Sequence, residues 1–332
     1  MKIIITGGRG FVGKAICEKF QNSNHQIHTI GRSRQFVKSD FPSNCFHHFL
    51  DLAKDPIPKS ICEKTDLIFH VAAKAGVWGK YNDFYSSNVV ATQNLISCCK
   101  TYRIPKLIYT SSPSVVFSGK PIRNGNETLE YGNTGLSLYA ETKKIAEKEI
   151  LLTHHSSKIQ TIALRPHLIW GENDPHLLPR VIKMHKKGKL RQVGNGKNMV
   201  DLTHVENVAH AHICAMKAMF KNPSLGGKAY FIGQSEPVEL WKWLNQIFIK
   251  LKLPKISNKI SFQNAFLLGG IMEKLWKFLH LKGEPPMTRF VASQLAHDHW
   301  FSNDLANQDL GYEPITSMSE SLDNCIDWLQ TL

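Results

Sequence analysis

Tyr139 and Lys143 have the residue types and the spacing of a proton-transfer site. On a helix, an i, i+4 spacing places both side chains on one face, where the ammonium can lower the pKa of the phenol from about 10. Such a tyrosine can exchange a proton with an alcohol or a carbonyl while a hydride moves. Thr110, Ser111 and Ser112 end an expected strand before this helix, and the Ser112 hydroxyl can polarise the same carbonyl.

The start of the chain can bind a phosphate group. Residues 2–6 read Lys-Ile-Ile-Ile-Thr, which predicts a buried strand, and Gly7, Gly10 and Gly13 follow directly. This spacing lets the backbone approach a pyrophosphate, aims amide N–H groups at it from a helix N-terminus, and packs the helix on the strand. Phe11 and Val12 open the expected helix. The stretch therefore predicts a dinucleotide site.

The elements that must position these residues alternate between strands and helices. Strands are expected at 27–30, 45–50, 66–71, 106–110 and 159–164, and long helices at 83–101 and 138–152. This alternation predicts an α/β fold with a doubly wound, Rossmann-type parallel sheet. Later helices are expected near 179–187, 204–220, 239–251 and 262–281. We expect a dinucleotide-binding domain at 1–165 and a smaller, mainly helical substrate-binding lobe at 166–332, with some segments returning to the first domain.

The turn after the second strand indicates which dinucleotide binds. NAD sites commonly carry Asp or Glu there for the ribose hydroxyls, but this strand is followed by Arg32 and Arg34, with no acid before Asp40. A guanidinium can form a charge-assisted fork with a 2′-phosphate, which favours NADP(H). NAD(H) stays open, because two solvated loop arginines fit the same pattern. Asp51 and Leu52, after the third strand, are placed to reach the adenine.

The composition excludes several classes of protein. With 332 residues, 42% hydrophobic and 20% charged, the chain is globular, and its seven cysteines lack C-x-x-C or zinc-type spacing. We therefore expect reduced thiols, a cytoplasmic setting and no metal. The net charge of +14 is accompanied by no nucleic-acid motif. Basic clusters at 183–191 and 250–259 are interpreted as solvated faces or as surface that attracts anions.

The segment 262–281 has the apolar character of a membrane helix without its length. Its longest run without charge is 261–272, whereas a spanning helix needs ~20 apolar residues. Apolar residues recur there at three- and four-residue steps, with one larger gap, and predict one apolar face: Phe262, Phe266, Met272, Leu275, Trp276 and Leu279. That face can pack on the core, wall an acyl pocket or make a peripheral membrane contact.

Together these motifs resemble the extended short-chain dehydrogenase/reductase family over nearly the whole chain. The matching segments are 6–13, 51–52, 70–73, 88–92, 109–112, 139–143, 165–166 and 201–207. The resemblance implies that Ser112, Tyr139 and Lys143 form a catalytic triad. It also implies cofactor contacts at Thr110, Ala72, Ala73 and Lys74, with Pro166 and His167 beside the nicotinamide. Ala91 departs from the family pattern, which has glycine there, and this puts the close packing of that helix in question.

Two features narrow the reaction within that family. Pro113 and Ser114 stand where sugar-nucleotide dehydratases carry an acidic pair, so a second acid/base for elimination of water is missing. Segment 163–171, Ala-Leu-Arg-Pro-His-Leu-Ile-Trp-Gly, resembles the 3β-hydroxysteroid dehydrogenase branch, which acts on large apolar alcohols and ketones. Segments 72–79, 177–180 and 288–290 are similar to those of bacterial 2-alkyl-3-oxoalkanoate reductases, which reduce a β-keto acid in olefin biosynthesis.

This likeness implies an NADP(H)-dependent oxidoreductase that reduces the ketone of a long-chain 2-alkyl-3-oxo acid to the β-hydroxy acid. We expect a homodimer, an apolar small-molecule substrate with an acidic group, and no nucleic-acid partner. Expected substrate contacts are Trp78, Tyr81, His167, Trp170, Leu177 and the 262–281 segment, with Lys74 or His167 meeting the carboxylate. The alternatives are a 3β-hydroxysteroid or sterol dehydrogenase, a sugar-nucleotide epimerase, or a regulatory protein that kept the fold and lost catalysis.

Overall fold

The computed structural model of this chain describes residues 1–33 and 41–332. Arg34 and Asp40, which the sequence places in the turn after the second strand, lie outside the described residues. In the described part of the chain, seven parallel strands form the central sheet in the order β3-β2-β1-β4-β5-β7-β12. Their bounds are β1 Lys2–Thr6, β2 Gln26–Gly31, β3 Cys45–Phe49, β4 Leu67–His70, β5 Lys106–Thr110, β7 Gln160–Pro166 and β12 Lys228–Ile232.

The strand order confirms the predicted fold class and locates the ligand-binding edge. The order reverses between β1 and β4, and doubly wound sheets bind their ligands at the carboxyl ends of the strands at such a switch point. Alternation along β1 shows why apolar runs form these strands: Ile3 and Ile5 enter the core on one face and Ile4 the core on the other.

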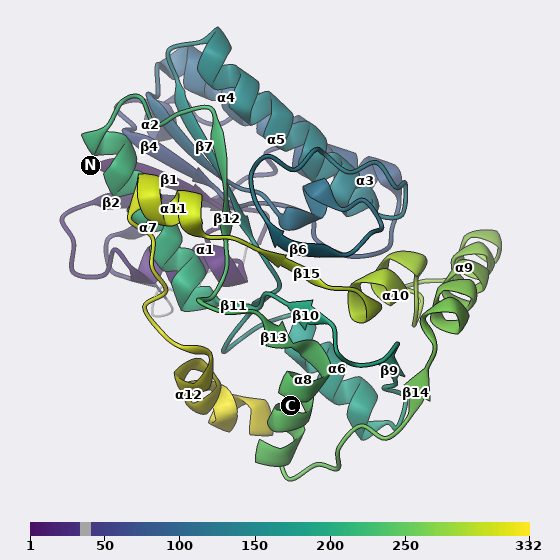
Figure 1. Ribbon diagram of the computed structural model, residues 1–332. Coiled ribbons are helices and arrows are strands. Elements are labelled where there is room, and N and C mark those ends of the chain that lie inside the picture. Colours follow the sequence, from purple (N-terminus) through teal and green to yellow (C-terminus); the bar gives the residue numbers. More distant parts are fainter. Residues whose placement is uncertain (34–40) are drawn as a thin grey trace.

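Helices cover both faces of this sheet (Figure 1). One face packs on α1 (Phe11–Glu18) and α7 (Val205–Lys221). The other packs on α2 (Lys59–Cys62), α4 (Ala91–Tyr102) and α5 (Leu138–Ser156). A helical stretch made of α3 (Tyr81–Tyr85) and a π-helical turn (Ser86–Val90) leads into α4. Ala91 is buried at that junction, so alanine in place of glycine does not prevent the helix from packing.

The second half of the chain builds a lobe with its own core around Trp170, Trp241 and Trp243. Its elements are β8 Ile169–Trp170, α6 Leu177–Lys186, β9 Gln192–Val193, β10 Met199–Val200, β11 Thr203–His204, β13 Val238–Glu239, α8 Leu240–Lys250, β14 Lys259–Ile260, α9 Phe262–Phe278, α10 Arg289–Ala296, β15 His299–Phe301 and α12 Met318–Gln330.

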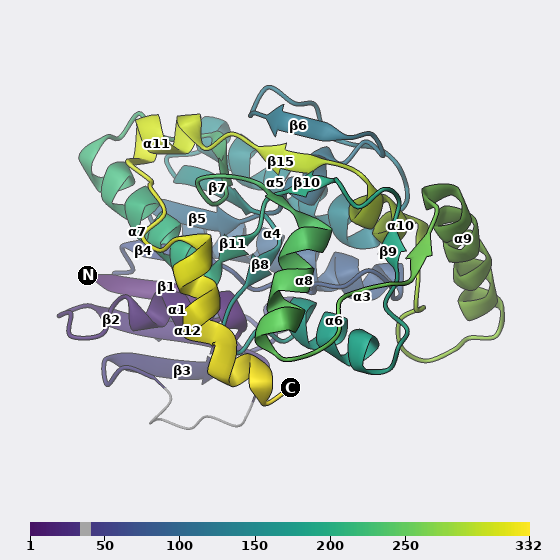
Figure 2. The same ribbon diagram turned by 60° about the horizontal axis from the view of Figure 1, so that its bottom comes forward.

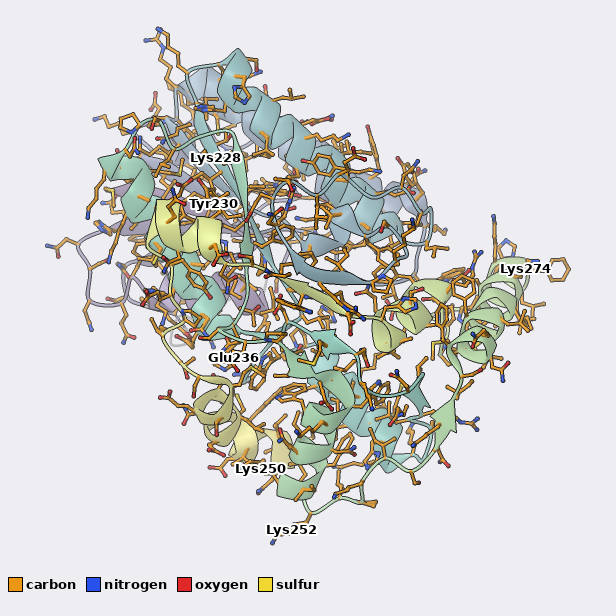
Figure 3. The ribbon with its side chains drawn as sticks, viewed as in Figure 1. Lys228, Tyr230, Glu236, Lys250, Lys252 and Lys274 are labelled. Atoms are coloured by element: carbon orange, nitrogen blue, oxygen red, sulfur yellow. The ribbon has the colours of Figure 1, made fainter. Side chains whose placement is uncertain are left out.

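Some segments cross between the two halves, as expected from the sequence. From beyond residue 165, α7, β12 and α11 (Asp304–Leu310) return to the central sheet, while β6 (Ile122–Gly125) of the first half pairs with β15. Figure 3 labels Lys228 and Tyr230 on β12; both bond to Asp309 of α11, at 2.7 and 3.0 Å. The domain boundary at residue 165 stays a prediction, because the lobe and the sheet share these elements.

Helix α9 lies at the edge of the molecule beside α10, as the two views in Figure 1 and Figure 2 agree. Within residues 1–33 and 41–332, no helix combines the length and the apolar character needed to cross a bilayer. Of the apolar face expected at 262–281, four side chains are partly buried and two, Leu275 and Leu279, are exposed. Leu267, Ile271 and Phe278, which are also exposed, were not part of the expected face.

Candidate active site

A cavity of about 630 Å³ lies at the carboxyl ends of the central strands. Its lining includes most of the predicted cofactor and catalytic residues: Gly7, Gly10, Phe11, Val12, Gly13, Arg32, Asp51, Leu52, Ala72, Ala73, Thr110, Ser112, Tyr139, Lys143 and Pro166. These residues come from α1, β5, α5 and β7 and from the loops after β1, β2, β3, β4 and β5. The fold thus brings the predicted phosphate loop and the predicted proton-transfer residues to one space.

The glycine turn at one side of this cavity fits a pyrophosphate. Gly7 has a φ of +69°, and a Cβ there would lie 2.9 Å from the Ala72 backbone. A Cβ on Gly13 would overlap the Gly7 carbonyl oxygen, so α1 can approach β1 only with glycine at this position. Gly10 caps α1 without a side-chain hydrogen bond, which leaves first-turn amides for an anion. A dinucleotide therefore fits the residues present.

Two guanidinium groups lie at the side of the cavity next to the end of β2, where the adenosine of a dinucleotide would bind. Arg32 lines it just after β2, and Arg9, inside the glycine turn, donates from Nη1 to Ser33 Oγ at 2.6 Å. The sequence analysis missed Arg9, although a basic residue within the glycine turn was a visible signal. Asp51 accepts from the Ala53 amide at 3.1 Å, so its carboxylate shapes the loop that carries Leu52.

The catalytic candidates converge from β5 and α5. Ser137 caps α5 by accepting from the Ala140 amide at 3.2 Å, and this sets the start of the helix that carries Tyr139 and Lys143. Ser112 follows β5 and caps a 3₁₀ turn (Pro113–Val116) by accepting from the Ser114 amide at 3.2 Å. A hydrogen bond between Ser112 and Tyr139 lowers the pKa of the phenol.

The electrostatics of this group differ from the sequence expectation. Lys143 Nζ donates to the Thr110 carbonyl at 2.6 Å and lies 4.0 Å from the centre of the Tyr109 ring. Burial lowers the pKa of Lys143 to about 7, against the attraction of Glu147. Burial also raises the pKa of Tyr139 to about 12, and Ser112 opposes this only in part. The expectation of a phenol acidified by the lysine was wrong, because burial dominates; at neutral pH Tyr139 is a protonated donor.

A buried polar network joins the glycine turn to the catalytic helix. Thr6 Oγ1 lies 2.8 Å from His70 Nδ1, and His70 Nε2 lies 2.8 Å from Thr92 Oγ1. The Thr92 hydroxyl donates to the Asn88 carbonyl at 2.6 Å, and Asn88 Nδ2 donates to Thr142 Oγ1 at 3.0 Å. Burial lowers the pKa of His70 to about 3, so the ring is neutral. The network fixes α5 relative to β1 and β4.

Two predicted cations do not line the cavity. The backbone amide of Lys74 donates to Asn88 Oδ1 at 2.7 Å, and the side-chain Nζ of Lys74 lies 3.5 Å from Asp83 Oδ2. His167 is buried, with Nε2 3.2 Å from His299 Nδ1. Burial holds the pKa of His167 well below its usual range. His167 is therefore neutral and cannot supply the positive charge expected for a substrate carboxylate.

The predicted apolar substrate contacts are also placed differently. Trp170 is fully buried in the lobe core, with its ring 5.2 Å from that of Trp243. Pairing of β8 with β11 turns this side chain inward, so the expectation that it contacts substrate is corrected. Tyr81 is exposed and stacks on Tyr85, whereas Trp78 is partly buried in the loop after β4. These side chains, Leu177 and α9 do not belong to the cavity lining.

Other residues complete the lining and were not predicted. They are Arg9, Ile30, Gly31, Ser33, Leu50, Val71, Ala75, Ser87, Ala91, Ser111, Leu168, Ile169, Asp174, Pro175 and His176. Ser111 has a buried hydroxyl with no partner in the described chain, and the Thr-Ser-Ser run signalled it. Leu168 has a φ of +36°, a strained backbone of the kind found at binding sites, which no sequence pattern announced.

The doubly wound sheet and its cleft define a dinucleotide-dependent oxidoreductase. Residues 4–263 match the 3-beta hydroxysteroid dehydrogenase/isomerase family, and the chain belongs to that family. It is accordingly an NAD(P)-dependent enzyme of the short-chain dehydrogenase/reductase type that acts on CH–OH and C=O groups.

Relatives agree with this assignment. The 2-alkyl-3-oxoalkanoate reductase of Stenotrophomonas maltophilia is 39% identical over 324 residues, 97% of either chain. The one of Shewanella oneidensis is 38% identical over 96% of this chain and 84% of its own. A sterol-4-alpha-carboxylate 3-dehydrogenase, decarboxylating, of Bos taurus is 32% identical over 97% of this chain and 90% of its own.

Among solved structures, the UDP-glucuronic acid 4-epimerase of Bacillus cereus, in complex with UDP-glucuronic acid and NAD, superposes with a TM-score of 0.76. The match covers 100% of this chain and 99% of the epimerase, at 23% identity. At this identity, the likeness is one of fold.

Proposed function

We propose that the chain reduces the ketone of a long-chain 2-alkyl-3-oxo acid to the β-hydroxy acid with NADPH. The observation that carries the proposal is that Ser112, Tyr139 and Lys143 line the same cavity as the glycine turn. A reduction needs a proton donor at the carbonyl oxygen, and a phenol whose pKa is raised to about 12 is in that form at neutral pH. The relatives named 2-alkyl-3-oxoalkanoate reductase supply the substrate class.

Each catalytic candidate then has one role. Ser112 and Tyr139 donate hydrogen bonds to the ketone oxygen, and Tyr139 transfers its proton as that oxygen becomes an alcohol. Lys143, held by the Thr110 carbonyl, orients the ribose end of the cofactor and supplies positive charge when it is protonated. The bound nicotinamide supplies the hydride. Ser111, whose buried hydroxyl lacks a partner in the described chain, is available to the same ligands.

The preference for NADP(H) rests on the adenosine side of the cavity. Arg9 and Arg32 both line it, and the described residues that follow β2 include no acid to bind the ribose hydroxyls. Two guanidinium groups can form charge-assisted hydrogen bonds with a 2′-phosphate. Arg32 is the primary contact in this proposal and Arg9 supports it, whereas NAD(H) would leave both without an anionic partner.

The substrate would occupy the side of the cavity that faces the lobe. Leu168, Ile169 and Pro175 provide apolar surface there, in place of the Trp170 that the sequence suggested. A second candidate function is oxidation of a sterol-type alcohol, because the sterol-4-alpha-carboxylate dehydrogenase is 32% identical over almost the whole chain. Both substrates combine a carboxylate with a carbonyl or hydroxyl on the third carbon and with a large apolar body.

The test is a screen of NADPH oxidation against long-chain 2-alkyl-3-oxo acids, steroid ketones and sugar nucleotides, with NADH in parallel. We expect the oxo acids to give the highest kcat/KM, and the Tyr139→Phe variant to give the background rate. Faster turnover of a steroid ketone under matched conditions would transfer the assignment to the sterol-type reaction.

We also propose that the enzyme works in a reducing, cytoplasmic compartment and as a homodimer. All seven cysteines are buried free thiols, which supports a reducing setting. The dimer rests on the resemblance to its family, and sedimentation of the purified protein tests it: a single species at the monomer mass would contradict it.

A further inference from the structure

Helix α9 carries apolar residues both on the side that packs inward, where Phe266 meets the lobe core, and on the side that faces outward. Ala265 and Gly269 are its buried positions. A Cβ on Gly269 would lie 2.6 Å from the backbone carbonyl carbon of Thr288, so glycine lets α9 pack closely against the start of α10. The inner side of α9 therefore packs as that of an ordinary surface helix does, but its leucines are left on the outer side.

The outward residues form one continuous apolar stripe. Their exposed fractions are 66% for Leu267, 39% for Leu268, 55% for Ile271, 44% for Leu275, 81% for Phe278 and 51% for Leu279, with Leu281 at 40% in the following turn. At about 100° per residue, the six helical positions fall within roughly a third of the helix circumference. We call residues 267–281 on this face the α9 stripe. Exposed apolar patches of this kind mark contact sites.

The charges around the α9 stripe are positive. Lys274, Lys277 and Lys282 are exposed and have no ion pair within the described residues, and Lys274 projects outward at the edge of the molecule (Figure 3). The neighbouring acids are already neutralised: Glu273 pairs with Arg289 at 2.7 Å, and Glu284 with Arg180 at 2.6 Å.

The same bias extends along the sequence. Residues 250–282 contain seven lysines and Glu273 as the single acid. Lys252, Lys255 and Lys259 are exposed in the segment that leads into α9. A partner of opposite charge to this region is therefore anionic.

We propose that the α9 stripe and its lysines bind the surface of an anionic lipid bilayer. The helix lies in the plane of the interface, with Phe278 and the leucines in the boundary between headgroups and acyl chains. The lysines stay at the level of the phosphates. The contact is peripheral, because α9 is too short and too charged to span.

Self-association explains the same surface less well. In a two-fold dimer the same patch meets itself, so Lys274, Lys277 and Lys282 would approach their own copies on two chains of formal charge +14 each. A stable protein interface also buries about 800 Å² on each partner, which is wide for one projecting helix. A bilayer offers both the opposite charge and an unlimited apolar layer.

The experiment is flotation of the purified full chain with vesicles, without cofactor or substrate. One set of vesicles is phosphatidylcholine alone and the other contains phosphatidylglycerol at about one third. We expect binding to the anionic vesicles at least about tenfold stronger than to the neutral ones, and weaker at high salt.

Three variants separate the apolar contribution to vesicle binding from the electrostatic contribution. Leu275→Ser with Phe278→Ser should reduce binding about tenfold or more, and Lys274→Glu with Lys277→Glu should remove the preference for anionic vesicles. Leu152→Ser is the matched control, because Leu152 is 63% exposed on α5 and carries the same chemistry elsewhere. It should bind as the unmodified protein does. All the altered side chains are exposed, so the melting temperatures should agree.

Two results would overturn the proposal. One is equal or absent binding to the two kinds of vesicle. The other is a concentration-dependent dimer that the Phe278→Ser change dissolves, with no vesicle binding, which would make the α9 stripe a protein interface. Because no substrate is present, failure here leaves the proposed reductase activity untouched, and failure of that activity leaves the vesicle result intact.

Discussion

The cofactor cleft and helix α9 depart from the usual distribution of polar and apolar groups in opposite ways. Lys143 in the cleft, and Thr6 and His70 in the network beside it, are polar residues with almost no exposure. On α9, Phe278 and Leu267 are large apolar residues with most of their surface in water. Buried polar groups cost stability unless they are hydrogen-bonded, and exposed apolar patches invite association. In our proposals, both departures lie at places where this molecule meets another.

The two regions also differ in how firmly they are held. One turn after Lys143, the Glu147 carboxylate accepts from Arg165 Nη2 at 2.6 Å, Arg165 Nε at 3.0 Å and the Tyr131 hydroxyl at 2.8 Å. This buried ion pair joins α5 to β7 beneath the site. Helix α9 has no such anchor at its outer face and packs chiefly on α10. Changes in the cleft should therefore affect chemistry or folding, and changes on the α9 stripe should affect neither.

The largest expected effect is that of Tyr139→Phe. This change removes only the transferable proton, so kcat should fall roughly 10²- to 10⁴-fold while cofactor affinity is nearly kept. Steady-state kinetics and fluorescence titration with NADPH measure the two quantities. Tyr102→Phe, on α4, is the matched control, and Phe278→Ser should also leave kcat unchanged on a water-soluble substrate. A Tyr139→Phe enzyme with half the normal kcat would contradict the role of Tyr139 as proton donor. It would also remove the functional distinction between the cleft and α9.

The next effect concerns Lys143 and pH. Burial lowers its pKa from 10.5 to about 7, so the folded protein releases this proton near neutrality while the unfolded chain holds it to about 10.5. Between these values the unfolded state binds more protons, and the contribution of Lys143 to stability rises with pH. Below about pH 7, Lys143 is protonated in both states, and the folded state carries the full free-energy cost of burying its charge.

Lys143→Met tests this titration. The variant should be the more stable protein near pH 7 and should lose that advantage at higher pH, by at most ~1.4 kcal/mol per pH unit. Denaturant unfolding from pH 7 to pH 9, without cofactor, gives the difference in unfolding free energy. A difference independent of pH would mean that Lys143 keeps its proton in the fold.

The sequence predicted the cleft well because its constraints are local. Close approach of the backbone requires glycine at Gly7 and Gly13. The helical repeat places Tyr139 and Lys143 on one face of α5, so the spacing of these residues and their position along the chain located the site. Six of the seven central strands were confirmed for the same reason, since each apolar run is bounded by turns, whereas β12 was not predicted. Helices α10, α11 and α12 were not predicted, because they are short or end a chain whose packing is set by distant segments.

What the sequence could not give is the direction in which a side chain points. Trp170 and His167 were assigned to substrate because they follow a cleft strand, but strand pairing and the His299 ring draw them into the interior. The apolar pattern of 262–281 predicted a face whose Phe266 and Trp276 are partly buried. It did not predict the exposed leucines beside that face, because the side of α9 that is covered depends on the close approach of the distant residue Thr288 to Gly269.

A smaller effect is expected from Arg32→Asp, which tests the adenosine side of the cleft. Loss of a charge-assisted contact of ~1.5 to 3 kcal/mol corresponds to roughly a 10- to 100-fold loss of NADPH affinity. NADH should bind better than before, because an aspartate accepts from ribose hydroxyls. Arg191→Asp, an exposed change of equal charge, is the control. Equal efficiency of the unmodified enzyme with NADH and NADPH would contradict the assignment.

The smallest effect per step is the response to acyl length, and it bears most directly on the comparison of the two regions. Burial of a methylene contributes ~0.8 kcal/mol, so kcat/KM should rise about fourfold for each added CH₂ until the apolar side of the cavity is full. Leu168 and Ile169 line that side, whereas α9 does not line the cavity, so the Phe278→Ser variant should show the same slope in detergent-free solution. A slope that falls in Phe278→Ser would make α9 part of the substrate site. A flat response in the unmodified enzyme would instead favour the rigid sterol-type substrate, whose apolar body does not lengthen by steps.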